Sequence, residues 1–192
     1  MPAATHLSFA AARGILADMT RQLLALAAGL VLCLGLARAQ SEDAKPSTPE
    51  DRAKAVQIAH ALEADPLAKG AKEQRLWVLH WIIEVPDIRV PVCNLLGPVF
   101  GSQDAISTAI FNQMVVSSTA FIIQNPDKAK DEAAVYTAGV EGSLRAYESI
   151  LKTKPKARWS FLDDLIAKRN KGELAEFVRQ TAADQCKAKG GS

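Results

Sequence analysis

The sequence has few of the motifs by which enzymes and cofactor-binding proteins are recognised. It contains no G-x-S-x-G nucleophile elbow, no glycine-rich phosphate loop and no paired-histidine motif, and it has only three histidines in 192 residues. Hydrolysis requires a nucleophile beside a base, and phosphate binding requires backbone N–H groups gathered in a glycine-rich turn. The sequence therefore indicates no cofactor and favours a protein without catalytic activity.

An excess of charge of one sign is also missing. The chain has 23 lysines and arginines against 21 acidic residues. Its one dense basic stretch, residues 152–158, surrounds Pro155 and is typical of a solvated linker between helices. A nucleic-acid-binding protein usually concentrates positive charge on one face. The composition therefore favours no nucleic-acid partner.

The N-terminus carries the pattern of a bacterial-type secretory signal. Arg21 precedes an apolar run from Leu23 to Leu36, which is followed by Ala37-Arg38-Ala39. A positive segment, an apolar segment and an A-x-A site predict cleavage after Ala39, so residues 1–39 form a signal peptide, with Met19 as an alternative start. The run is shorter than the ~20 residues that a membrane span needs, so a retained anchor is the weaker interpretation. We expect a periplasmic or secreted protein.

Cleavage leaves about 150 residues, the size of one domain. Residues 40–47 are polar and are predicted to be a flexible tether, residues 48–187 a single helical domain, and residues 188–192 a disordered tail. Two cysteines remain, Cys93 and Cys186. In an oxidising compartment they are predicted to form a disulfide, with two buried free thiols or a redox-active pair as alternatives.

Hydrophobic periodicity predicts an all-α fold, an irregular bundle of five to six helices with one disulfide and no significant β-sheet. The expected helices cover residues 49–64, 67 or 71 to 85, 102–124, 126–154, 160–171 and 173–186. Residues 85–101 contain two Val-Pro pairs and give no confident assignment. The third and fourth helices are expected to form an antiparallel hairpin across Asn125-Pro126.

Several residues mark the helix ends. Thr48 before Pro49 predicts an N-cap, Ser102 predicts another, Ser160 with Asp163 predicts a capping box, and Gly172 a helix end. The helix at 102–124 is apolar enough to raise the question of a membrane span. Polar residues in its middle favour a buried core helix, so no membrane span is expected after cleavage. Gly139 and Gly142 are predicted to permit close approach of another backbone.

Three residues are weak candidates for a metal site. His80 and Glu84 lie four positions apart on one helical face, and His60 on the preceding helix is a third candidate ligand. A buried, hydrogen-bonded histidine among Trp77, Trp81 and Ile83 is the more common situation for such a residue. Glu84 and Asp87 also flank Pro86, where two carboxylates are usually solvated rather than catalytic.

Large apolar side chains suggest a second kind of site. They can line a groove for an apolar ligand or for a segment of another envelope protein, although such residues more often form plain core. The candidates are Trp77, Trp81, Phe100, Phe111, Met114 and Phe121. The favoured hypothesis is therefore a non-enzymatic binding or structural module of the cell envelope. The alternative is an enzyme or metal-binding protein with a site assembled from distant residues around His80 and Glu84.

Overall fold

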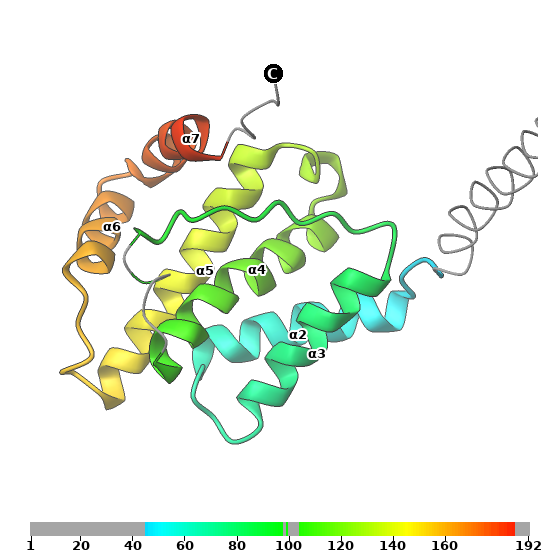
Figure 1. The fold of residues 1–192 in the computed structure, drawn as a ribbon, viewed down its shortest axis with the longest axis horizontal. Coiled ribbons are helices and arrows are strands. Elements are labelled where there is room, and N and C mark those ends of the chain that lie inside the picture. Colours follow the sequence, from blue (N-terminus) through cyan, green and yellow to red (C-terminus); the bar gives the residue numbers. More distant parts are fainter. Residues whose placement is uncertain (1–44, 98, 100–103, 187–192) are drawn as a thin grey trace, which may run out of the picture. The chain divides into compact units, whose positions relative to one another are not determined.

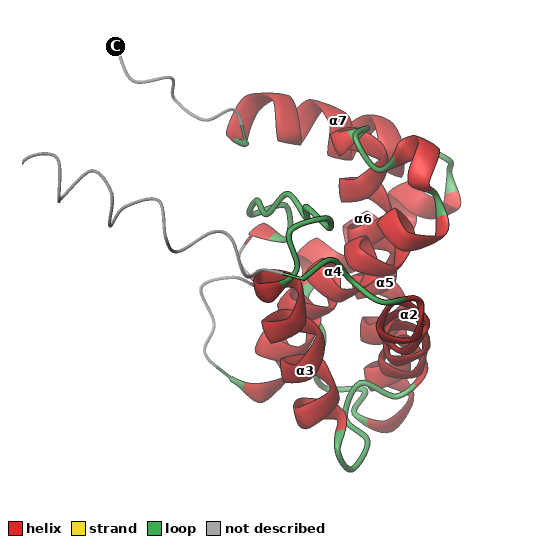
Figure 2. Ribbon diagram, turned by 90° about the vertical axis from the view of Figure 1, so that its right-hand side faces the viewer, coloured by secondary structure: helices red, strands yellow, loops and turns green. Residues whose placement is uncertain are grey.

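The computed structural model describes residues 45–97, 99 and 104–186. The predicted signal peptide, residues 40–44 of the predicted tether, Phe100, Ser102 and the predicted tail lie outside these residues. Six α-helices and one 3₁₀ turn follow one another along the described chain (Figure 1). They are α2 (Pro49–Ala64), α3 (Ala71–Glu84), α4 (Ala105–Gln124), η2 (Pro126–Lys128), α5 (Glu132–Thr153), α6 (Ser160–Asn170) and α7 (Leu174–Gln185). The described part has no strand (Figure 2), which confirms the all-α prediction.

The helix ends follow local chemistry in most places. The Thr48 side chain caps α2 by accepting from the Asp51 N–H, and Gly172 ends α6 with φ +77°. The start of α4 differs from the prediction, because the helix begins at Ala105 and Asp104 accepts from the N–H groups of Ile106 and Ser107. An aspartate two residues beyond Ser102 thus satisfies the free N–H groups of the first turn.

The predicted capping box at Ser160 is wrong. Ser160 is the first residue of α6, and Trp159 occupies the cap position without a side-chain bond. The buried Tyr147 hydroxyl of α5 instead accepts from the Trp159 N–H at 2.9 Å and donates to Asp163 at 3.1 Å. Asp163 is therefore used by a tertiary contact, which replaces the local capping interaction.

The centre of the bundle is α4, which packs against α2, α3 and α5. Ser143 Oγ donates to the Ile110 carbonyl, and Ser118 Oγ donates to the Val135 carbonyl. The contacting residue numbers rise on one helix as they fall on the other, so α4 and α5 form the predicted antiparallel hairpin. By length and composition α4 could cross a membrane, and 67% of its apolar window is buried inside the fold.

Glycine allows this hairpin to close. An added Cβ at Gly139 would meet the Met114 carbonyl oxygen at 2.7 Å, closer than real Cβ atoms come to another atom. An added Cβ at Gly142 would overlap the Ser117 side chain. The predicted close approach of another backbone is confirmed at Gly139, where that backbone is α4, whereas at Gly142 the close neighbours are the side chains of Ser117 and Glu63.

The second predicted helix is less central than its apolar sequence indicates. The apolar residues that α3 buries are Ala71, Val78 and Trp81. Arg75 is also buried, and its guanidinium donates to the Pro66 carbonyl at 3.0 Å. Ile83 is 81% exposed, and His80 is exposed rather than enclosed by its aromatic neighbours. When apolar residues surround a helix on every side, their spacing does not mark one side as the buried face, so sequence alone does not say which face is buried.

The chain between α3 and α4 crosses the bundle in an extended path, visible in Figure 1 as the long loop over α4 and α5. It leads to Cys93, which forms a disulfide with Cys186 at the end of α7, with a Cα–Cα distance of 5.6 Å. The predicted disulfide is confirmed. It fastens the last helix to the loop that follows α3.

Asp87 attaches the start of the described chain to this loop. Its carboxylate accepts from Ser47 N at 2.9 Å, Ser47 Oγ at 2.7 Å and Arg52 Nη2 at 2.6 Å. Desolvation raises the pKa of Asp87, but these hydrogen bonds outweigh it and lower the pKa to about 2. Asp87 is therefore a structural anchor that stays ionised, and Ser47, the last residue of the predicted tether, is bound to the domain.

Candidate functional site

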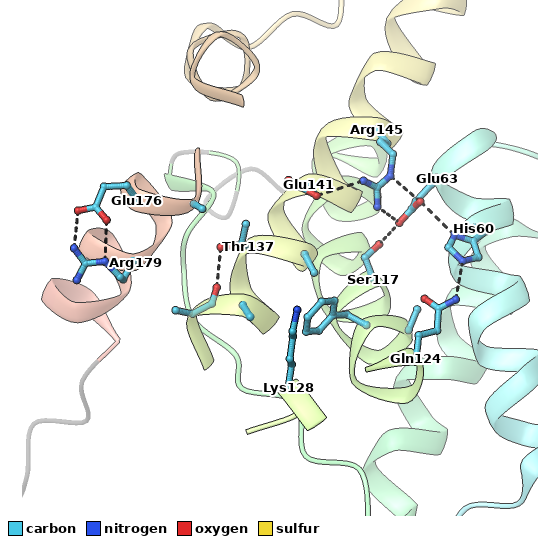
Figure 3. A pocket seen from close by; sticks show the side chains of 16 residues that line it. His60, Glu63, Ser117, Gln124, Lys128, Thr137, Glu141, Arg145, Glu176 and Arg179 are labelled. Atoms are coloured by element: carbon cyan, nitrogen blue, oxygen red, sulfur yellow. Dashed lines mark hydrogen bonds and ion pairs between the residues drawn. The ribbon is translucent and has the colours of Figure 1, made fainter. Parts of the chain in front are cut away.

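A cavity lies over the outer face of α5, between α2 and α4 on one side and α7 on the other (Figure 3). We call it the α5 pocket. Its volume of about 540 Å³ lies within the range of small-molecule sites, about 300–1,000 Å³. Its apolar wall consists of Ala120, Phe121, Ala133, Ala134, Ala138 and Ala175. Its polar lining consists of His60, Glu63, Ser117, Gln124, Lys128, Thr137, Glu141, Arg145, Glu176 and Arg179.

The amphipathic pattern of α5 explains the small side chains of this wall. Val140, Leu144 and Tyr147 turn towards α4 and the core, where they are fully or almost fully buried. Ala134 and Ala138 are four residues apart and lie on the other side of the helix, where methyl groups fill little space. Because neither α2 nor α7 covers this strip, a hollow remains above it.

A buried carboxylate closes one end of the α5 pocket. Glu63 of α2 is 9% exposed. Arg145 of α5 donates to it twice, from Nε at 2.8 Å and from Nη2 at 2.9 Å. Ser117 of α4 donates its hydroxyl proton to Glu63 Oε1 at 2.7 Å. Three helices therefore meet at one carboxylate.

The electrostatics of this cluster keep Glu63 ionised. Burial is the largest single effect and works to raise the pKa of Glu63. The hydrogen bonds from Arg145 and Ser117 and the positive charge of Arg145 together outweigh burial, so the pKa lies below its ordinary value. The same pairing raises the pKa of Arg145. A carboxylate held in this way is a weak base.

The serine, histidine and acid in this pocket do not form a catalytic relay. In such a relay the histidine lies between the nucleophile and the acid. Here Ser117 donates directly to Glu63, and His60 Nδ1 lies 3.6 Å from the same carboxylate on its other side. The Gln124 amide nitrogen lies 3.5 Å from His60 Nε2.

A buried amide extends the cluster into the core. Gln113 is fully buried and donates to Ser117 Oγ at 3.0 Å and to the Ala59 carbonyl at 3.2 Å. These bonds fix the Ser117 hydroxyl as a donor towards Glu63. The Gln113 Oε1 atom has no hydrogen-bond partner among the described residues. Gln113 therefore orients the Ser117 hydroxyl from the core side. Through its bond to Glu63, Ser117 holds α4 against α2.

Removal of Arg145 should destabilise the fold in a pH-dependent way. Arg145→Met keeps the apolar stem of the side chain but leaves the Glu63 carboxylate buried with Ser117 and His60 as its partners. We expect a loss of about 2 kcal/mol at pH 7. Because the pKa of Glu63 is lowered in the native protein, that carboxylate's stabilising contribution is present above its unfolded pKa and is lost as pH falls through its folded pKa. Urea denaturation between pH 3 and pH 7 measures the difference.

The difference between the two proteins should shrink as Glu63 becomes protonated at low pH. Arg179→Met is the matched control, because Arg179 and Glu176 form an exposed pair. Such exposed pairs contribute little to stability. A loss that is the same at pH 3 and at pH 7 would show that Arg145 acts by packing alone.

The remaining charged groups of the pocket have different partners. Arg179 Nη2 binds Glu176 at 2.6 Å within α7. Glu141 lies 3.8 Å from Arg145. Lys128, on η2, forms no ion pair with the described residues, and Figure 3 shows its side chain extending towards the interior of the pocket.

The predicted metal ligands are not gathered into one site. His60 lies in the α5 pocket beside Glu63, whereas His80 and Glu84 are exposed on α3. Among the described residues, no group of three or more histidine, cysteine or acidic side chains is placed to hold a metal ion. Asp87 is bound to Ser47 and Arg52, so it does not form a carboxylate pair with Glu84.

The large apolar candidates are distributed over several parts of the core. Trp77 and Trp81 stack with ring centroids 5.6 Å apart, and Lys54 Nζ lies 3.8 Å from the Trp77 centroid. Phe111 and Met114 pack in the cluster between α4, α5, α6 and α7. Of the described candidates, only Phe121 lines the α5 pocket.

The polar centre of the pocket was missed by sequence reasoning. Glu63 and Arg145 are 82 residues apart, and each is unremarkable on a charged helix face. One signal was present: Gln113 and Ser117 lie four residues apart within an apolar helix, which places two polar groups on one buried face. Buried polar groups require partners, so this pair indicates a polar contact from another helix.

A second groove lies between the end of α3 and the extended loop. It contains the two most exposed large apolar side chains of the described chain, Ile83 and Val92 at 81% and 60%. Ile82, Ile88, Val90 and Pro91 complete its apolar part. Exposed apolar groups that are clustered are typical of contact surfaces.

Searches of protein-family models, curated proteins and solved structures give no match to this chain.

Proposed function

We propose that this protein is exported, that it is cleaved after Ala39, and that it acts in the periplasm or outside the cell as a non-enzymatic binding protein. The α5 pocket carries the proposal. The α5 pocket combines an alanine-rich apolar wall with several charged groups on one concave surface. In ligand sites, apolar lining contributes affinity and a few polar groups orient the ligand. The disulfide supports an oxidising compartment.

The geometry of the polar residues favours binding over catalysis. The Glu63 carboxylate is committed to Arg145 and Ser117, and its lowered pKa opposes proton transfer near neutral pH. The Ser117 hydroxyl donates to that carboxylate rather than to a base that could activate it. Both groups are suited to fixing the shape of the pocket.

A neutral fluorescent probe tests the binding proposal without presuming a charge on the ligand. N-phenyl-1-naphthylamine brightens when it enters an apolar cavity. We expect it to bind the mature protein, and we expect Ala138→Leu, which places a large side chain in the cavity, to weaken binding by about tenfold or more. Ala183→Leu, on the exposed face of α7 outside the α5 pocket, is the control.

Export is tested separately by fractionating cells that express the full chain and sequencing the N-terminus of the soluble protein. An N-terminus at Gln40 in the periplasm or medium supports the proposal. An intact precursor in the cytoplasm would overturn export. A probe that binds the Ala138→Leu protein as tightly as the native protein would overturn the assignment of the pocket.

A further inference from the structure

We propose that the ligand of the α5 pocket is a small organic acid, whose apolar body lies against the alanine wall and whose carboxylate binds the Lys128 ammonium. This inference rests on the proposed function, because it names the ligand class of the same site. It is carried by the distribution of charge around the pocket.

The pocket has three permanent cations and three carboxylates in its lining. Arg145 is bound to Glu63 through two hydrogen bonds, and Arg179 is bound to Glu176 through two more, at 2.9 and 2.6 Å. Each of these bidentate pairs neutralises itself and offers little to a ligand. Lys128 is the lining cation for which the described residues provide no carboxylate.

The position of Lys128 suits an anion that enters with an apolar tail. It stands on η2, and its side chain extends inward between the Glu63 cluster and the Glu176–Arg179 pair (Figure 3). Phe121, Ala133 and Ala134 line the same cavity. A ligand that places its carboxylate on the ammonium can therefore lay its hydrocarbon chain along this wall, where removal of apolar surface from water favours binding.

A cationic ligand fits the same cavity poorly. Its charge would face Lys128, and Glu63 and Glu176 already accept hydrogen bonds from arginines. Glu141 lies 3.8 Å from Arg145, beside the Glu63 cluster rather than beside Lys128. At Lys128, charge complementarity therefore favours a negative charge on the ligand. The volume of about 540 Å³ is that of a small-molecule site.

A series of three ligands with one tail and different head groups tests the inference. Octanoate, 1-octanol and octylamine are titrated against the mature protein, and each is measured by displacement of N-phenyl-1-naphthylamine. We expect octanoate to bind about tenfold more tightly than the alcohol, and the amine to bind most weakly. The preference for octanoate should decrease as salt is raised, because an exposed ion pair is screened.

Two variants locate the charge. Lys128→Gln should remove the preference of octanoate over octanol. Lys130→Gln is the matched control, since Lys130 is an exposed lysine two residues away that lines the second groove instead. Both lysines are exposed, so neither change should alter folding, which circular dichroism verifies.

The outcomes separate this inference from the proposed function. If all three ligands bind equally and Ala138→Leu abolishes their binding, the pocket is a ligand site but the carboxylate assignment is wrong. If octanoate keeps its preference in Lys128→Gln, the anion binds elsewhere and the inference is overturned. If neither the probe nor any of the three compounds binds, both proposals fail.

Discussion

Replacing Cys93 and Cys186 by serine should lower the free energy of unfolding by about 4 kcal/mol. The bond joins positions 93 residues apart. Closing a loop of about 100 residues restricts the unfolded chain by up to about 4.7 kcal/mol in the entropy model. The expected fall in melting temperature is about 10 °C for a domain of this size.

The disulfide also has a local role, because it joins the extended loop to the end of α7. Cys186 ends α7, whose fully buried side chains are Leu174 and Val178. Without the bond, the end of α7 and the extended loop should separate before the hairpin of α4 and α5 unfolds. Hydrogen exchange should therefore show the earliest loss of protection near Cys186.

Chemical denaturation with and without reductant provides the control. Reductant should shift the native protein to the midpoint of the double-serine variant, and it should leave the variant unchanged. Equal midpoints for the native protein under both conditions would contradict the bond.

The second large effect is expected from a single methyl group. Gly142→Ala should destabilise the protein by about 3 kcal/mol, although alanine is favoured over glycine in a helix by about 1 kcal/mol. The added Cβ would overlap the Ser117 side chain and would lie 2.8 Å from Glu63 Oε1. Either α4 and α5 move apart or the bond from Ser117 to Glu63 is broken, and both changes weaken the core.

A double-mutant cycle distinguishes these contacts from a general effect of the substitution. Ser117→Gly removes the obstructing side chain, so Gly142→Ala should be far less harmful in that background. We expect a coupling energy of about 2 kcal/mol, measured by urea denaturation. A Gly142→Ala protein as stable as the native protein would mean that α4 and α5 do not pack at the described distance.

Local interactions made much of the fold predictable. Thr48 and Pro49 set the start of α2, and Gly172 sets the end of α6, because a cap is made by residues next to one another in the chain. The repeat of large side chains in α5 fixes its core face, since helical geometry converts spacing into direction. The disulfide was predictable because only two of the three cysteines, Cys93 and Cys186, lie outside the predicted signal peptide.

Other features depend on residues that meet only in the folded protein. The cap of α6 was predicted wrongly because Tyr147, distant in sequence, satisfies the Trp159 N–H and binds Asp163. His80 was expected inside and lies outside, because an apolar helix such as α3 acquires a buried side only from the neighbours it packs on.

The sequence by itself determined where the helices lie and that they pack together, since periodicity, caps and hydrophobic content act within short stretches of chain. Only the tertiary structure decided how α2, α4 and α5 meet at Glu63, and that a cavity remains between them and α7. The physical reason is that a buried ion pair and a cavity are properties of side chains from separate helices. Their positions depend on crossing angles and distances that no local pattern specifies.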